Sequence, residues 1–143
     1  DGNGWHDLGS MLQHGAGVAA DPAEAARCFR RAADAGNPDG MNSLGVMLQT
    51  GAGVEADPAE AARWYRMAAD RGNIYGMHNL AELYAAGRGV AADEAEAVRW
   101  YRKGAEAGSP AGMCNLGAWY QNGQGVAWNL PEAARWFRAA ADA

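Results

Sequence analysis

The sequence predicts an all-α protein built from four repeated units. The chain has 143 residues, and shifting it by 36 positions aligns it with itself without a gap. Glycine supplies 20 of those residues and returns at fixed intervals, while no alternating strand pattern occurs anywhere. A fixed period between about 20 and 50 residues indicates stacked supersecondary units. The predicted single domain of 1–143 therefore divides into units at 1–36, 37–72, 73–108 and 109–143.

Several columns of identical residues carry the repeat. One column holds glycine in every unit: Gly17, Gly53, Gly89 and Gly125. A second column holds arginine: Arg27, Arg63, Arg99 and Arg135. Six tryptophans, five tyrosines and 49% hydrophobic residues supply ample apolar surface to bury, which argues against a disordered low-complexity chain.

Each unit begins with a predicted amphipathic helix. In the second unit Met41, Leu44 and Leu48 lie at positions i, i+3 and i+7, which is the spacing of one helical face. This pattern predicts a helix of about eleven residues. Gly51 and Gly53 follow it, and we expect one of them to form the left-handed cap at its C-terminus.

A second helix is predicted from Asp57 onward. Aspartate at the N-cap accepts a backbone N–H, and Pro58 at the first helical position has no N–H to lose. Glu60 stands where it can complete a capping box. Similar starts recur at 21–24, 93–96 and 129–132. The body of this helix combines alanine pairs with aromatic residues, so that large and small side chains can interdigitate.

These features together resemble the Sel1-like repeat, a relative of the tetratricopeptide repeat with a longer loop. The matching elements are Leu-Gly at 44–45, Gly-x-Gly-Val at 51–54, the Asp-capped second helix with its Ala-x-Arg-Trp-Tyr-Arg-x-Ala-Ala body at 61–69, and a Gly-Asn exit at 72–73. The match covers the whole chain, with local departures such as Cys28 and Phe29 in place of Trp-Tyr. The resemblance implies a right-handed α-solenoid that acts as a non-enzymatic protein–protein or peptide interaction scaffold.

The resemblance also implies a binding groove on the first helix of each repeat, where side chains vary between units. The candidate groove residues are His6, Ser10, Gln13, His14, Asn42, Val46, Gln49, Thr50, Tyr75, His78, Glu82, Gln121 and Asn122. Amides, hydroxyls and imidazoles of this kind can hydrogen-bond a peptide backbone. Such variation would also arise on an unconstrained solvated surface, so the pattern leaves both interpretations open.

No catalytic or metal-binding motif accompanies the repeat, and we expect no enzyme activity and no cofactor. His6 and His14 lie eight residues apart on one helix, about 12 Å, too far to share a zinc ion. An alternative of another class remains: a cell-wall-acting protein, penicillin-binding or hydrolase-like, or a carbohydrate binder, as described for some relatives. Substrate turnover by the purified chain would favour it.

The charge of the chain limits its partners. Twelve basic residues face seventeen acidic ones, a net charge of −5, which argues against nucleic acid as the main partner. The arginine columns could form a stripe for an anionic partner, but Glu24, Glu60, Glu96 and Glu132 each precede an arginine by three residues, which favours local pairing. No apolar stretch is long enough to predict insertion into a membrane. The compartment stays open.

The last expectations concern cysteines and ends. Cys28 and Cys114 form no spaced set, so no disulfide framework is predicted; Cys28 aligns with an aromatic column and is expected in the core. Terminal repeats of a solenoid need a polar outer face. Here Trp5, Trp128 and Trp136 lie near the two ends, so the array either continues in a longer chain or copies associate end to end.

Overall fold

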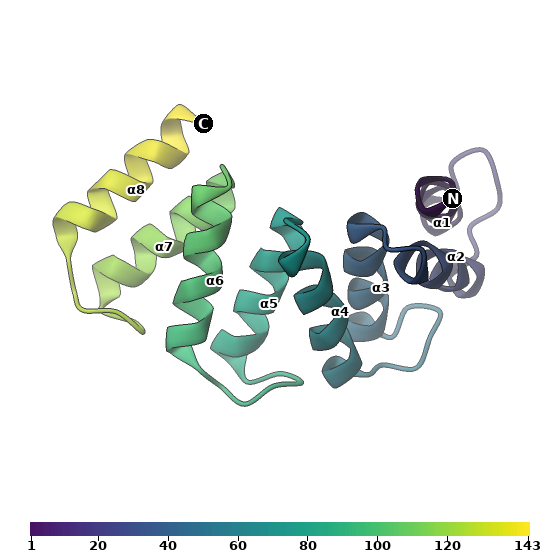
Figure 1. The fold of residues 1–143 in the computed structure, drawn as a ribbon, viewed down its shortest axis with the longest axis horizontal. Helices are drawn as coiled ribbons and strands as arrows, with labels where there is room; N and C mark the ends of the chain where they lie inside the picture. Colours follow the sequence, from purple (N-terminus) through teal and green to yellow (C-terminus); the bar gives the residue numbers. More distant parts are fainter. The chain divides into compact units, whose positions relative to one another are not determined.

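The computed structural model describes all residues 1–143. It contains eight α-helices and no strand, which confirms the all-α prediction (Figure 1). The helices form four pairs, one in each repeat. Their bounds are α1 Gly2–His14, α2 Pro22–Asp34, α3 Pro38–Thr50, α4 Pro58–Asp70, α5 Ile74–Ala86, α6 Glu94–Glu106, α7 Pro110–Asn122 and α8 Leu130–Asp142. Every helix has 13 residues, two more than the apolar pattern of the first helix predicts.

The chain divides into two compact units, which we describe separately. Unit 1 comprises Asp1–Gly76 and unit 2 comprises Met77–Ala143, so the boundary falls within α5. In unit 1, α1 packs on α2, α2 on α3, and α3 on α4. In unit 2, α6 packs on α7 and α7 on α8. That the whole chain is one domain stays a prediction.

The Gly-x-Gly turn has two separate steric roles. The first glycine forms the predicted left-handed cap, with φ of 73° at Gly51. The second, Gly53, also has a positive φ of 72° and lies against the start of α2. A Cβ there would come within 2.2 Å of the Pro22 carbonyl, so no larger residue fits. The turn therefore ends α3 and packs closely against the first residues of α2 in the preceding repeat.

The predicted capping of the second helices is confirmed in its first half. The carboxylate of Asp57 accepts the backbone N–H of Glu60 at 2.8 Å. The Glu60 carboxylate, instead of returning to the Asp57 backbone, accepts hydrogen bonds from Trp64 and Arg30. The first half of the box alone satisfies an orphan helix N–H.

The core is built from large side chains lying on small ones. The ring of Tyr65 is fully buried against Gly45, where an added Cβ would lie 2.6 Å from it. Phe29 covers Gly9 in the same way. Burying aromatic rings of this size supplies much of the apolar stabilisation of a repeat. The small first-helix residue is thus what lets the second helix approach.

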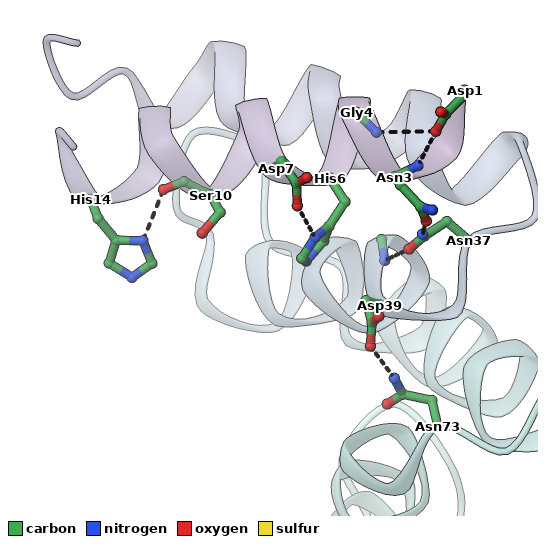
Figure 2. Close-up of polar contacts among 11 residues, drawn as sticks. Asp1, Asn3, Gly4, His6, Asp7, Ser10, His14, Asn37, Asp39 and Asn73 are labelled. Atoms are coloured by element: carbon green, nitrogen blue, oxygen red, sulfur yellow. Dashed lines mark hydrogen bonds and ion pairs between the residues drawn. The ribbon is translucent and has the colours of Figure 1, made fainter. Parts of the chain in front are cut away.

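Asparagine caps connect successive repeats within unit 1. The side-chain Oδ1 of Asn37 accepts the Gly40 N–H at 2.6 Å, and its Nδ2 group donates to Asn3 Oδ1 at 2.7 Å. Asn73 repeats the arrangement, donating to Asp39 at 2.7 Å (Figure 2). These caps start the first helices at residue 38 and 74, which accounts for their extra length.

Candidate functional site

The predicted groove residues of α1 share one side of that helix. Figure 2 shows His6, Ser10 and His14 along this side. The His6 ring lies half-buried with its centroid 5.7 Å from that of Phe29, and its Nδ1 is 3.4 Å from the Asp7 carboxylate. The His14 ring donates to the Ser10 carbonyl at 2.9 Å, and Gln13, also on α1, is exposed.

The α3 residues form a partly buried row next to α1, which α3 contacts. Asn42, Val46 and Gln49 are half-buried, and Thr50 is exposed. The Thr50 hydroxyl donates back to the Val46 carbonyl at 2.8 Å. Gln49 Oε1 accepts the Tyr65 hydroxyl at 2.6 Å. Several polar groups of this row are therefore held by internal hydrogen bonds.

At the start of α5 the predicted groove residue Tyr75 is 69% exposed.

In unit 2 the structure gathers a cluster around His78. His78 Nε2 lies 3.3 Å from the Glu82 carboxylate on the same helix. Asn115 on α7 places its Nδ2 3.4 Å from His78 Nδ1, which links α5 to α7. The His78 ring centroid is 5.9 Å from that of Tyr101, and Tyr101 in turn packs edge-on against Trp119. We call His78, Glu82, Tyr101 and Asn115 the His78 cluster.

Sequence reasoning identified His78 and Glu82 but missed the other two members of this cluster. Asn115 lies one column beyond the one chosen, where Asn79 precedes it by 36 residues, and that recurring amide was the available signal. Tyr101 was counted only as core. Burial raises its pKa to about 12, and the nearby Glu82 carboxylate acts in the same direction. The predicted residues Gln121 and Asn122 lie exposed in the last turn of α7, outside the cluster.

Charge is divided between the two kinds of helix. The first helices α1, α3, α5 and α7 carry Asp7, Asp39 and Glu82 but no lysine or arginine. All twelve cations belong to the second helices or the loops: Arg27, Arg30, Arg31, Arg63, Arg66, Arg71, Arg88, Arg99, Arg102, Lys103, Arg135 and Arg138. The first-helix surface therefore presents acceptors and neutral groups.

The arginine column of Arg27, Arg63, Arg99 and Arg135 pairs locally in three of the four repeats, as the favoured interpretation predicts. Arg27 pairs with Glu24, which raises the pKa of the guanidinium through a direct hydrogen bond. Arg99 lies 2.9 Å from Glu96. Arg135 lies 3.3 Å from Glu132. Exposed pairs of this kind stabilise a fold by about 0 to 1 kcal/mol.

The second repeat departs from this pattern because Glu60 turns to the preceding repeat. Its carboxylate accepts from Trp64 Nε1 at 3.1 Å and from Arg30 at 3.0 Å, and these bonds lower its pKa. A surface hollow of about 280 Å³ is lined there by Glu60, Arg63, Trp64 and Met67. All four belong to α4, so the hollow lies on the surface of one helix, away from the predicted groove residues.

Other chemistry is sparse in the structure. No group of three or more histidine, cysteine, aspartate or glutamate side chains could hold a metal ion. None of the eight helices combines the length and apolar character of a membrane span. Both cysteines are free, with Cys28 buried as expected and Cys114 exposed. Burial raises the pKa of the Cys28 thiol.

Apolar side chains are exposed in the first and last repeats where their equivalents are buried. Leu8 is 38% exposed, whereas Leu44, in the same column, is fully buried. Phe137 is 38% exposed, whereas the equivalent Tyr65 is buried. Trp128 is also exposed. Leu8 and Phe137 thus occupy positions that are buried elsewhere in the chain, whereas Trp128 stands in a column whose other members, Ala20, Ala56 and Ala92, are also exposed.

The protein consists of four helix pairs, and a Gly-x-Gly turn joins the two helices of each pair. This arrangement defines an α-solenoid of the tetratricopeptide-like class. The chain belongs to the Sel1 repeat family, whose model matches residues 6–37, 38–73, 74–109 and 110–143. The second, third and fourth matched repeats begin one residue after the units predicted from the sequence, and the first begins at residue 6. A comparison with curated proteins gives no match.

Solved structures with the same repeat are similar to this chain over nearly its full length. A protective antigen of uropathogenic Escherichia coli strains, described as displaying an SLR fold, and a Sel1 repeat protein of Oxalobacter formigenes each share 34% identity with a TM-score of 0.94 over 99% of the chain. The chain spans only 30% and 58% of the lengths of those two proteins. Cysteine rich protein B of Helicobacter pylori shares the fold at 20% identity and a TM-score of 0.68, with 86% of this chain and 88% of that one covered.

Proposed function

We propose that this protein is a non-enzymatic interaction module that binds a partner protein or peptide through the variable side chains of its first helices. Sel1 repeat proteins are generally protein-interaction scaffolds, which supports the general role. The observation that carries the finer proposal is the contrast between repeated framework and varied surface. One column of the first helices varies and holds His6, Asn42, His78 and Cys114. The column two residues further along is leucine in every repeat.

The second-helix surface is a weaker candidate for binding. Three arginines of the first column are engaged by glutamates of their own helices. A partner would have to displace those pairs, whereas the first-helix face offers half-buried amides and imidazoles. Interfaces gain most from partly buried, well-positioned groups near their centre.

The test compares two sets of substitutions in the full chain. A partner peptide is first selected from a random display library on the immobilised protein. Replacing Asn42, Gln49 and His78 together by alanine should weaken its binding at least tenfold, about 1.4 kcal/mol. Arg63→Ala with Arg99→Ala is the matched control and should leave binding within twofold. The opposite ranking would contradict the proposal.

The cell-wall-acting or carbohydrate-binding alternative gains no support from the relatives or from the site. The His78 cluster places an imidazole beside a carboxylate, but half-buried histidine–glutamate pairs are common surface features. Hydrolysis of a chromogenic β-lactam by the purified chain, abolished by His78→Ala, would favour this alternative over the interaction module.

We propose in addition that the 143-residue chain self-associates end to end. The exposed Leu8 and Phe137 lie on faces whose equivalents form the contacts between successive repeats. Such a contact is heterologous and can propagate. Sedimentation velocity should show mass rising with concentration, and Phe137→Ser with Trp128→Ser should suppress the rise. A wild-type chain that stays monomeric at the highest soluble concentration would exclude it.

A further inference from the structure

We propose that the His78 cluster binds a cationic side chain, arginine or lysine, of the partner peptide. This inference rests on the proposed function and specifies the chemistry of the partner. It follows from three independent features of unit 2: the absence of cations on its first helices, the state of the Glu82 carboxylate, and the acceptor groups around it.

Charge complementarity is the first feature. On α5 and α7 the only charged side chain is Glu82, and neither helix carries lysine or arginine. The one charge that these helices themselves present to a ligand is therefore negative, and the cation that reaches them from α6, Arg102, is bonded to the Tyr120 hydroxyl at 2.6 Å. A carboxylate attracts a cation and disfavours an acidic segment at this range, and partial burial strengthens the effect.

The second feature is that Glu82 differs from the second-helix glutamates. Glu24, Glu96 and Glu132 each pair with an arginine of their own helix. Glu82 instead faces an imidazole at 3.3 Å, and its side chain is 45% exposed. The ion-pair partner of Glu82 is this imidazole, rather than a lysine or an arginine. Glu82 is thus positioned and charged, but no guanidinium neutralises it.

The third feature is the set of acceptors that surrounds Glu82. Asn115 uses its Nδ2 group toward His78 Nδ1, which leaves its Oδ1 as an acceptor. The hydroxyl of Tyr101 can accept as well. In the preceding repeat the equivalent Tyr65 hydroxyl is bonded to Gln49, but the residue at that position here is Ala85, whose methyl group cannot bond. A carboxylate, an amide oxygen and a phenol oxygen suit the several N–H donors of a guanidinium.

The test uses two probe peptides of similar shape, of which only one carries a cationic side chain. One is acetyl-Gly-Arg-Gly-Asn-Gly-amide, and in the other citrulline replaces arginine, which keeps the shape and removes the charge. Each is titrated into the isotope-labelled full chain and followed by amide chemical shifts. We expect saturable shifts at 78, 82 and 115 with the arginine peptide and at least tenfold weaker binding of the citrulline peptide.

Matched variants locate the interaction. Glu82→Gln should weaken the arginine peptide at least tenfold and remove its preference over citrulline. Glu106→Gln, which makes the same change on the exposed surface of α6, should leave affinity unchanged. Equal affinity for the two peptides, no detectable binding, or equal losses in the two variants would each overturn the inference.

A second readout separates this inference from the proposed function. The peptides selected from the display library should be enriched in arginine or lysine. Selected acidic or neutral peptides whose binding is lost in the Asn42, Gln49 and His78 variant would overturn the cationic specificity and leave the interaction role standing. Basic peptides that bind but respond to Arg63 and Arg99 substitutions alone would contradict both.

Discussion

Tyr65 and Tyr101 occupy the same position in successive repeats, yet their surroundings differ. Both rings are buried beneath a first helix. The Tyr65 hydroxyl is fixed by Gln49, whereas Tyr101 contacts the rings of His78 and Trp119 and lies near the Glu82 carboxylate. At this position of the repeat, the tyrosine hydroxyl is therefore hydrogen-bonded to a first-helix side chain in unit 1, whereas in unit 2 the tyrosine lies beside an imidazole and a carboxylate.

The same contrast extends along the first-helix faces. In unit 1 the polar groups bond to one another or to the backbone: Thr50 to Val46, His14 to Ser10, and Asp39 to Asn73. In unit 2 the Glu82 carboxylate faces the His78 imidazole and lies near Tyr101, whereas the similar Asp7–His6 pair of unit 1 lies beside Phe29, which has no hydroxyl. A few first-helix substitutions are thus enough to give a repeat a different polar surface while its packing is retained.

The largest expected effect compares a tightly packed helix glycine of unit 1 with a loosely packed helix glycine of unit 2. Gly40→Ala would place a Cβ 2.4 Å from the Ala32 Cβ and 3.1 Å from its backbone, so we expect a loss of about 3 kcal/mol. Gly104→Ala meets only side-chain atoms at 3.9 Å or beyond and removes a glycine from the last turn of α6, so we expect a gain of up to about 1 kcal/mol. Urea denaturation measures both, and equal effects would contradict the packing described.

The two tyrosines should respond differently to the loss of the hydroxyl. Tyr65→Phe leaves the Gln49 amide oxygen without its donor and should cost about 1 kcal/mol at pH 7. Tyr101→Phe should cost little there. Denaturant unfolding of the two variants would show this difference, and a larger loss for Tyr101→Phe would contradict the assignment.

Alkaline pH provides a second comparison of Tyr101 with its variant. Its native pKa of about 12 exceeds the unfolded value near 10, so the unfolded state loses its proton first. Stability should therefore fall as pH rises from about 10 to 12, by about 1.4 kcal/mol per pH unit from this residue. The difference between the wild type and Tyr101→Phe should show this slope in chemical denaturation, and a pH-independent difference would contradict it.

The smallest expected effect distinguishes local from inter-repeat ion pairs. Arg135→Ala removes an exposed pair within α8 and should cost about 0.3 kcal/mol. Arg30→Ala removes the α2–α4 bond to the partly buried Glu60 and should cost about 1 kcal/mol. A double-mutant cycle with Glu60→Gln isolates the pair, and a coupling near zero would show that Arg30 and Glu60 do not interact.

The features that sequence predicted are those set by residues close together in the chain. The period, the helix pairs, the Asp57 cap and the Gly51 cap all follow from patterns within one repeat. Two properties escaped prediction because they depend on neighbouring repeats. Glu60 pairs with Arg30, and Asn115 reaches His78, across 30 and 37 residues of sequence. The packing of helices from different repeats determines which side chains meet, and the period alone does not specify that packing.

The central claim, that the first helices bind the partner, is tested most directly by mapping a library-selected peptide on the isotope-labelled full chain. The account predicts that side-chain shifts at His6, Asn42 and His78 exceed those at Trp64, Trp100 and Trp136. It also predicts intermolecular nuclear Overhauser effects from the first group alone. Effects confined to the tryptophans of the second helices would contradict the account.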